Sequence, residues 1–285
     1  MKKIFLVLMS AFITVCLSAQ KRPMDIRIWP DGPAEDNGIT SPESTGDWGM
    51  VTNVSEAHMY VYKASRPNGT AIIMCPGGGY FGLSIDSEGH DMAQWMTGEG
   101  ITYIVLKYRM PNGHPEIPLA DVQEAIRIVR ENAGEWGVDR VGVMGSSAGG
   151  HLAASAANLF TSEENRPDFQ ILLYPVIEFG EFEMGPAVEA FFGKEPRKED
   201  KERFNLLKHV SRQSPKAFIT ASADDPTVPV SESIRYFSAL NEAGVSASMH
   251  IYPTGGHGWG YGEHFRYHRD WTDELMKWLR EENLY

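Results

Sequence analysis

The chain has 285 residues, of which 42% are hydrophobic and 22% charged, so it can bury a sizeable core. Its formal net charge of −12 disfavours nucleic acid, anionic lipid surfaces and other polyanions as partners, whereas a neutral polysaccharide or small ester would not be repelled. The two cysteines and nine histidines form no cluster with the spacing of a zinc site.

The first 19 residues have the features of an export signal. A basic start, Lys2-Lys3, is followed by the nearly unbroken apolar run Ile4–Leu17 and by the small pair Ser18-Ala19. A membrane-spanning helix needs about 20 apolar residues, so the run is too short to span. We therefore expect a secreted or periplasmic protein without stable membrane insertion, and a retained anchor is the alternative. Cleavage would leave one cysteine and no internal disulfide.

The rest of the chain, residues 20–285, is typical of one α/β domain. Residues 20–50 are rich in Pro, Gly, Asp and Ser and should wrap the surface as extended chain. The predicted strands are Met59–Tyr62, Ala71–Cys75, Thr102–Tyr108, Arg140–Met144, Phe169–Tyr174, Ala217–Ala221 and Ser248–Tyr252. The predicted helices are Leu119–Glu131, Ala148–Phe160, Ser231–Ala243 and Arg266–Glu281. Because continuous apolar strands alternate with helices, we expect a mainly parallel sheet with helices on both faces.

One long, charged stretch, residues 178–214, interrupts this alternation. It could be an insertion that caps a functional site, or a meandering surface connection. Its phenylalanines could line a pocket for an acyl group, although packing onto the sheet is the simpler interpretation. These residues are Phe179, Phe182, Phe191 and Phe192.

The segment Gly145-Ser146-Ser147-Ala148-Gly149 matches the pattern G-x-S-x-G. It follows a predicted strand and opens the Ala-rich predicted helix, which is the context that this pattern requires. A serine on such a sharp turn sits in strained backbone with its oxygen exposed, and small neighbours give the turn its room. We therefore predict that Ser147 is a nucleophile, against the alternative of a plain Gly/Ser-rich turn.

A glycine-rich loop, Pro76–Tyr80, directly follows the predicted strand Ala71–Cys75. An acyl-transfer site needs two backbone N–H groups aimed at the developing oxyanion. One should come from Ala148, the residue after the nucleophile, and the other from Gly78 or Gly79. A phosphate-binding loop is disfavoured because no Lys follows the glycines.

A third loop supplies the expected general base. His257 lies in Gly255-Gly256-His257-Gly258-Trp259, after the last predicted strand, and it is the histidine that such a loop could bring to the serine. A fourth loop, Asp224–Pro229, places a carboxylate after the strand Ala217–Ala221. Its D-x-x-V-P spacing favours Asp225 over Asp224 as the partner of the histidine. The resulting order, Ser-Asp-His, is that of acyl hydrolases with this sheet topology.

These residues together resemble the acetyl esterase/lipase group of the α/β-hydrolases, a branch that includes acetyl-xylan-esterase-like proteins. The resemblance covers most of the mature chain. It extends over Ile28–Gly32, Pro76–Tyr80, Glu88-Gly89, Lys107–Arg109, Gly145–Leu152, Asp225–Pro229 and Gly256–Gly258. It implies an eight-stranded sheet, hydrolysis of short-chain esters, often acetyl groups on sugars, and no metal or organic cofactor. Related lipases often begin the oxyanion loop with His, so Pro76 favours the polysaccharide-esterase branch.

The expected reaction is a two-step acyl transfer in which His257 deprotonates Ser147 and Asp225 orients the imidazole. Tyr80 and Trp259, with Tyr261, flank the predicted site and could stack on sugar rings, although packing into the domain is the simpler interpretation. A serine peptidase or a small-amide hydrolase on the same scaffold remains an alternative, as does a non-catalytic carbohydrate-binding member. The sequence leaves the natural ester and the number of subunits open.

Overall fold

The computed structural model describes residues 22–46, 49–179 and 185–285. The predicted export signal lies outside these ranges. Within them, no helix combines the length and the hydrophobicity that a membrane span requires.

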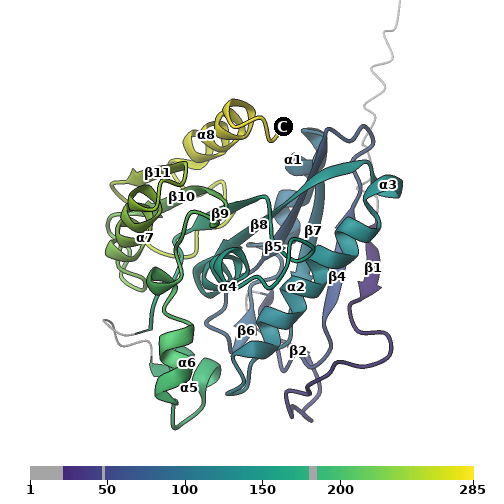
Figure 1. Ribbon diagram of the computed structural model, residues 1–285, viewed down its shortest axis with the longest axis vertical. Coiled ribbons are helices and arrows are strands. Elements are labelled where there is room, and N and C mark those ends of the chain that lie inside the picture. The colour runs from purple at the N-terminus through teal and green to yellow at the C-terminus, as the bar shows by residue number, and fades with distance from the viewer. Residues whose placement is uncertain (1–21, 47–48, 180–184) are drawn as a thin grey trace, which may run out of the picture.

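An eight-stranded sheet with the strand order β1-β4-β7-β5-β8-β9-β10-β11 forms the centre of the fold (Figure 1). β4 is antiparallel to both of its neighbours, and the other strand pairs are parallel. This confirms the predicted fold class. The strands are β1 Met24–Arg27, β4 His58–Tyr62, β5 Gly69–Cys75, β7 Thr102–Lys107, β8 Val138–Ser146, β9 Phe169–Leu173, β10 Lys216–Ser222 and β11 Ala247–Tyr252.

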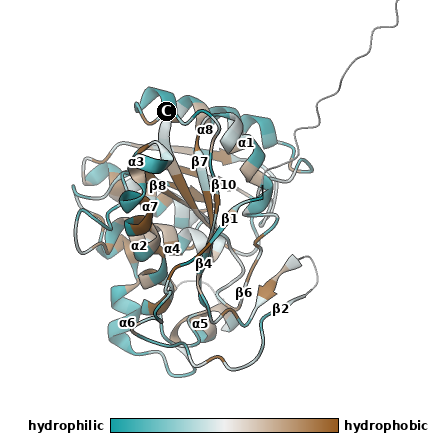
Figure 2. Ribbon diagram, turned by 90° about the vertical axis from the view of Figure 1, so that its right-hand side faces the viewer, coloured by the Kyte–Doolittle hydropathy of each residue, from teal (hydrophilic) through white to brown (hydrophobic). Residues whose placement is uncertain are grey.

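Helices cover both faces of this sheet, with α1 and α8 on one face and α2, α4 and α7 on the other (Figure 2). The helices are η2 His90–Met92, α1 Ala93–Gly98, α2 Glu116–Glu131, α3 Ala133–Trp136, α4 Ser147–Asn158, α7 Ser231–Glu242 and α8 His268–Glu281. α8 buries one apolar stripe, formed by Trp271, Leu275, Trp278 and Leu279. Figure 2 shows the hydrophobic strands between helices whose outer sides are hydrophilic.

The strand registers bring five strand ends to one edge of the sheet. Cys75 of β5 lies opposite Gly145 of β8, and Ser146, the last residue of β8, lies opposite Leu173 of β9. β10 and β11 end side by side at Ser222 and Tyr252. The loops that follow these strands therefore meet, although they are far apart in the sequence.

The N-terminal segment is more ordered than the expected extended chain. β1 pairs with β4 at the edge of the main sheet, and Ser44–Thr45 (β2) joins Val51–Thr52 (β3) and Gly82–Leu83 (β6) in a separate three-stranded sheet. β2, β3 and β6 have only two residues each, and β1 is a mostly exposed edge strand. Such strands leave no apolar run in the sequence, so their pairing was not predicted.

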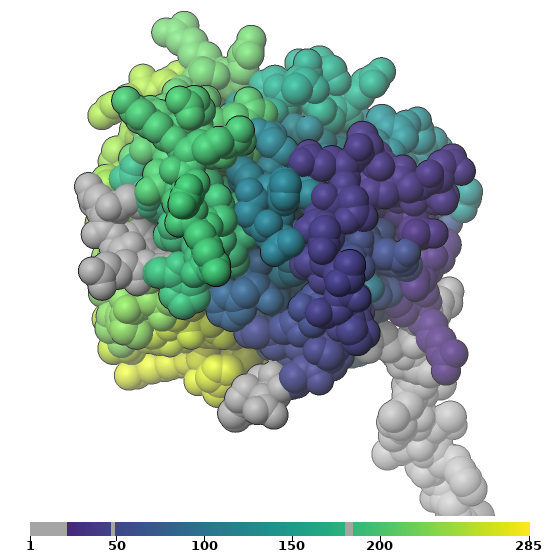
Figure 3. Space-filling view, turned by 90° about the horizontal axis from the view of Figure 1, so that it is seen from below, coloured from purple at the N-terminus to yellow at the C-terminus, as the bar shows by residue number. Residues whose placement is uncertain are grey.

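The segment 178–214 contains α5 Gly185–Phe192, α6 Lys198–Arg203 and a 3₁₀ turn, η3 Leu206–Lys208. Figure 3 looks onto this end of the molecule and shows the green residues of α5 and α6 on its surface. Phe191 and Phe192 are buried, and Phe191 packs edge-on against Phe204 with ring centroids 5.1 Å apart. Phe179 and Phe191 also contact His151 of α4, with ring centroids 4.9 and 5.3 Å apart, so the described phenylalanines pack the segment onto the main domain. Phe182 lies outside the described residues.

Candidate active site

The turn from β8 into α4 fixes the position of Ser147. This residue has φ +55°, a left-handed conformation that is strained for any residue with a side chain. A Cβ at Gly145 would lie 2.0 Å from the carbonyl oxygen of Gly149, and one at Gly149 would lie 2.1 Å from that of Cys75. Both glycines are therefore required by close backbone contact, as the G-x-S-x-G pattern predicts.

Three side chains from three separate loops form a hydrogen-bonded series at this edge. His257 Nε2 lies 2.8 Å from Ser147 Oγ, and His257 Nδ1 lies 2.7 Å from Asp225 Oδ2. The Asp225 side chain is fully buried, whereas that of His257 is 17% exposed. A hydroxyl beside an imidazole whose other nitrogen faces a carboxylate can lose its proton and attack a carbonyl carbon.

The two neighbouring aspartates hold different parts of the histidine loop. Asp225 contacts the imidazole, and its Oδ1 accepts the N–H groups of Thr227 at 2.8 Å and Val228 at 2.9 Å. Asp224 is exposed, and its Oδ1 accepts the N–H of Gly256 at 2.9 Å. The structure thus places Asp225 against the ring and Asp224 against the backbone of the same loop.

The glycine loop after β5 lies next to the serine. Gly78 has φ +132° and Gly79 φ +62°, conformations that favour glycine. Among the described residues, no acceptor forms a hydrogen bond with the backbone N–H of Gly78 or of Gly79. Ala148 is in the first turn of α4, where backbone N–H groups have no partner within the helix. These three N–H groups are therefore available to a negatively charged oxygen beside Ser147.

A buried carboxyl group that the sequence analysis did not single out lies behind this loop. Glu88 Oε2 accepts the N–H of Gly77 at 2.7 Å, and its Oε1 accepts the hydroxyl of Tyr174 at 2.7 Å. Burial raises the pKa of Glu88, and the two hydrogen bonds and the nearby His257 oppose this increase. The pair Glu88-Gly89 belongs to the family resemblance, but no pattern around it indicates a role.

A pocket of about 530 Å³ opens in front of Ser147 and His257. Its wall includes Pro186 and Ala187 of α5, so the segment 178–214 contributes to the site. Phe81 also lines the pocket and is 49% exposed, which makes it the aromatic side chain that a ligand there can reach. The remaining lining residues are Met50, Gly78, Gly79, Ser84, Ser87, Glu88, Pro226, Thr227 and Gly258.

The two aromatic residues suggested for sugar stacking point elsewhere. Tyr80 is 1% exposed and stacks on Phe191 with a centroid distance of 4.3 Å. Trp259 is 2% exposed and stacks on Phe265, also at 4.3 Å. Because neither ring offers a face to solvent, Tyr80 and Trp259 pack into the domain, the simpler of the two interpretations, and are not available to stack on a sugar. Phe81 is the aromatic residue that lines the pocket in their place.

Cys75 lies at the end of β5 and is fully buried. Burial raises the pKa of its thiol, so this cysteine stays protonated and is a poor nucleophile. In the described part of the chain, no group of three or more His, Cys, Asp or Glu side chains could hold a metal ion.

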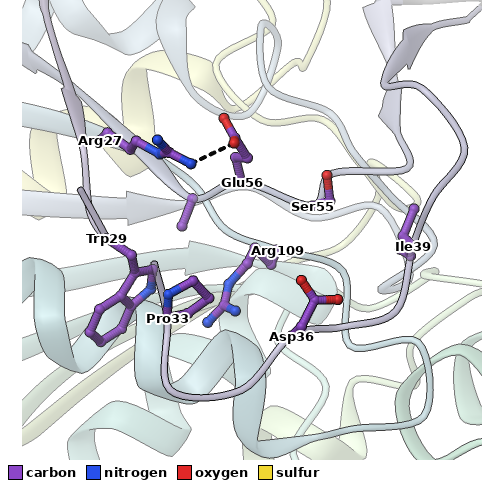
Figure 4. Close-up of a pocket in the computed structure, with 9 residues that line it drawn as sticks. Arg27, Trp29, Pro33, Asp36, Ile39, Ser55, Glu56 and Arg109 are labelled. Atoms are coloured by element: carbon purple, nitrogen blue, oxygen red, sulfur yellow. Dashed lines mark hydrogen bonds and ion pairs between the residues drawn. The ribbon is translucent and has the colours of Figure 1, made fainter. Parts of the chain in front are cut away.

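A second pocket, of about 170 Å³, lies between the N-terminal segment and the end of β7 (Figure 4). Trp29, Pro33 and Arg109 line one side of it. Both of its arginines form ion pairs: Arg27 with Glu56 at 2.6 Å, and Arg109 with the buried Asp121 at 2.6 Å. This pocket contains no residue of the predicted site.

The geometry at the sheet edge agrees with comparisons to known proteins. Residues 72–260 match the sequence model of a protein family whose description is alpha/beta hydrolase fold. The crystal structure of an acetyl ester-xyloside bifunctional hydrolase from Caldicellulosiruptor lactoaceticus superposes with a TM-score of 0.77 at 31% identity, covering 92% of this chain and 97% of that one.

Two curated relatives are similar in sequence. An acetylxylan esterase from Xylanibacter ruminicola is 40% identical over 241 residues, which cover 81% of this chain and 49% of that protein. An endo-1,4-β-xylanase B from Butyrivibrio fibrisolvens is 32% identical over 203 residues, which cover 66% of this chain and 32% of that protein. The chain therefore spans about half the length of the first relative and about a third of the second.

Proposed function

The chain belongs to the α/β-hydrolase family, and from this premise we propose that it is a serine esterase that removes acetyl groups from xylan or its oligosaccharides. The observation that carries the proposal is the contact of Ser147 Oγ with His257 Nε2 at 2.8 Å, with Asp225 on the other side of the ring. The names of the acetylxylan esterase and of the acetyl ester-xyloside hydrolase both indicate an acetyl ester, which is a substrate that this arrangement can attack.

In the proposed reaction, the Ser147 oxygen attacks the carbonyl carbon of the ester while His257 takes the serine proton. Asp225 stabilises the imidazolium that forms. The N–H groups of Gly78, Gly79 and Ala148 stabilise the oxyanion, which should lower the barrier by about 3 kcal/mol per donor. His257 then protonates the leaving sugar oxygen, and water, deprotonated by the same imidazole, releases acetate from the serine.

The proposed substrate is a neutral, acetylated sugar chain. The site is open to one side through a pocket of about 530 Å³, and Phe81 at its wall offers an exposed ring on which a sugar can stack. The net charge of −12 favours a neutral substrate over polyuronates. The names of the relatives point to xylan, and the predicted export signal would bring the enzyme to a polymer that does not enter cells.

The proposal is tested by measuring acetate release from a panel of acetylated polysaccharides, with acetylated xylan and acetylated mannan compared. Nitrophenyl acetate and an aminoacyl-nitroanilide serve as small ester and peptidase substrates. We expect acetate release from xylan and cleavage of the small ester. Cleavage of the nitroanilide without ester hydrolysis would contradict the proposal and favour the peptidase alternative.

The sugar-binding part of the proposal has its own test. Replacing Phe81 by Ala should raise KM for an acetylated xylo-oligosaccharide, because the stacking surface is lost, and should leave KM for nitrophenyl acetate nearly unchanged. Ile234→Ala, which removes an exposed apolar side chain on α7, is the matched control. An unchanged KM for the oligosaccharide in the Phe81 variant would remove this residue from the substrate site.

A further inference from the structure

The buried carboxylate of Glu88 connects the two loops that flank Ser147. Its Oε2 accepts the N–H of Gly77 at 2.7 Å, which fixes the start of the glycine loop. Its Oε1 accepts the hydroxyl of Tyr174, and this hydroxyl in turn accepts the N–H of Gly260 at 2.8 Å, three residues after His257. One side chain thus ties the glycine loop, the end of β9 and the histidine loop together.

The packing around these hydrogen bonds leaves little freedom. A Cβ at Gly77 would lie 2.5 Å from Glu88 Oε2 and 3.0 Å from Ser147 Cβ, so the carboxylate and the serine enclose the same glycine. The ring of Tyr174 lies edge-on to that of His257 with centroids 4.9 Å apart. A shift of Glu88 would therefore be transmitted to the oxyanion donors and to the imidazole.

The negative charge of Glu88 also favours the proposed reaction. Both oxygens accept hydrogen bonds, the arrangement of an ionised carboxylate. Glu88 is 4% exposed, and among the described residues its oxygens bond to the N–H of Gly77 and the hydroxyl of Tyr174 and to no Lys or Arg. A buried negative charge without a cation is costly for folding. The positive charge that develops nearby is that of His257 during attack on the ester.

We infer that Glu88 is a positioning residue for acyl transfer, which holds the glycine loop through Gly77 and the histidine loop through Tyr174. Its charge acts on the imidazolium of His257 together with that of Asp225. The inference rests on the proposed function, since it assigns a role in that reaction. It makes Glu88 neither a nucleophile nor a proton donor, because both of its oxygens are occupied by donors.

The test compares Glu88→Gln and Tyr174→Phe with the wild type in two assays, hydrolysis of nitrophenyl acetate and the rate of covalent labelling by a fluorophosphonate. An amide keeps the shape of the carboxylate but can accept at only one of its two ends. We expect Glu88→Gln to lower kcat by about 100-fold with little change in KM, because misplaced reacting groups lose rate and not binding. Labelling should slow in parallel.

The pH dependence separates the charge of Glu88 from its geometry. Without the carboxylate, protonated His257 is less stabilised, so the acid limb of kcat/KM should move to lower pH in Glu88→Gln. Tyr174→Phe removes the hydroxyl and retains the charge, so it should lower kcat without that shift. Asp225, which faces the imidazole, and Asp224, which accepts the N–H of Gly256 in the same loop, are the same in both variants. The ring of Tyr174, which lies edge-on to the imidazole, is retained as Phe in Tyr174→Phe.

Glu232→Gln is a matched control for the loss of a buried carboxylate. Glu232 is 1% exposed and accepts two backbone N–H groups, from Ile177 at 2.9 Å and Glu178 at 2.8 Å. This variant should lose stability, measured by thermal unfolding, and keep the wild-type pH profile. The inference would be overturned if the activity of Glu88→Gln fell only in proportion to its amount of folded protein and its pH profile did not shift.

The outcomes for the inference and for the proposed function are distinguishable. A wild type that neither hydrolyses the ester nor reacts with the fluorophosphonate would overturn both. If the wild type is active and Glu88→Gln reacts at the same rate, the inference is overturned and the proposed function is not. If Glu88→Gln does not fold, Tyr174→Phe decides: wild-type kcat in that variant would overturn the role of the Glu88–Tyr174 pair.

Discussion

The two aspartates of the loop after β10 allow a matched test of the proposed catalytic series. Asp225 Oδ1 accepts the N–H groups of Thr227 and Val228, so an asparagine at this position must place its oxygen there. Its NH₂ group then takes the place of Asp225 Oδ2, which lies 2.7 Å from His257 Nδ1 in the wild type. Two donors would face each other unless the imidazole moves its proton to Nε2.

A proton on Nε2 would block the reaction, because this nitrogen lies 2.8 Å from Ser147 Oγ and must accept the serine proton. We therefore expect Asp225→Asn to lower kcat by about 10⁴-fold, the effect of the wrong tautomer in such a series. This corresponds to about 5 kcal/mol of barrier height. KM should change little, since the substrate pocket is untouched.

Asp224→Asn is the control. Its oxygen can still accept the N–H of Gly256, and the residue does not touch the imidazole, so kcat should stay close to that of the wild type. The assay is steady-state hydrolysis of nitrophenyl acetate, with circular dichroism to show that both variants are folded. Equal losses in the two variants, or a larger loss in Asp224→Asn, would refute the assignment of Asp225.

Three further predictions concern folding, pH and export. Gly149→Ala should lower the free energy of unfolding by about 3 kcal/mol or abolish folding, because its Cβ would lie 2.1 Å from the Cys75 carbonyl oxygen; normal thermal stability would contradict the backbone contact. Burial lowers the pKa of His151 to about 4, so the unfolded chain takes up a proton at higher pH than the folded one, and stability should be lost as pH falls from about 6.5 to 4. Denaturant titrations should show a loss of about 3 kcal/mol over this range that His151→Gln reduces, and an identical pH dependence in the variant would contradict it. The expressed chain should be found outside the cytoplasm with Gln20 at its N-terminus, and an intact Met1 in the exported protein would contradict cleavage.

The sequence was most informative where burial or backbone geometry leaves a local pattern. β5 is buried at all of its seven residues, and such a strand reads as a continuous apolar run. The turn at Ser147 needs glycine on both sides and therefore carries a recognisable pattern. Gly256 and Gly258 on either side of His257, with φ +62° and +75°, likewise form a recognisable pattern. Each of these signals lies within a few residues of the feature that it predicts.

Features that depend on distant contacts left no such pattern. The hydrogen bond from Tyr174 to Glu88 joins residues 86 positions apart, and neither neighbourhood indicates it. Sequence also could not tell which way an aromatic side chain beside the site would turn. Tyr80 has φ +63°, and its ring is buried against Phe191, while the next residue, Phe81, is half exposed. The order of the short strands β2, β3 and β6 likewise follows from tertiary pairing alone.

Covalent capture of the proposed nucleophile is the most direct measurement. The wild-type protein and Ser147→Ala are treated with a fluorophosphonate, the adduct is mapped by mass spectrometry, and acetate release from acetylated xylan is measured in parallel. We expect one adduct, on Ser147, and in the variant neither the adduct nor acetate release above background. An adduct at another residue, or a variant that releases acetate at the wild-type rate, would contradict the account.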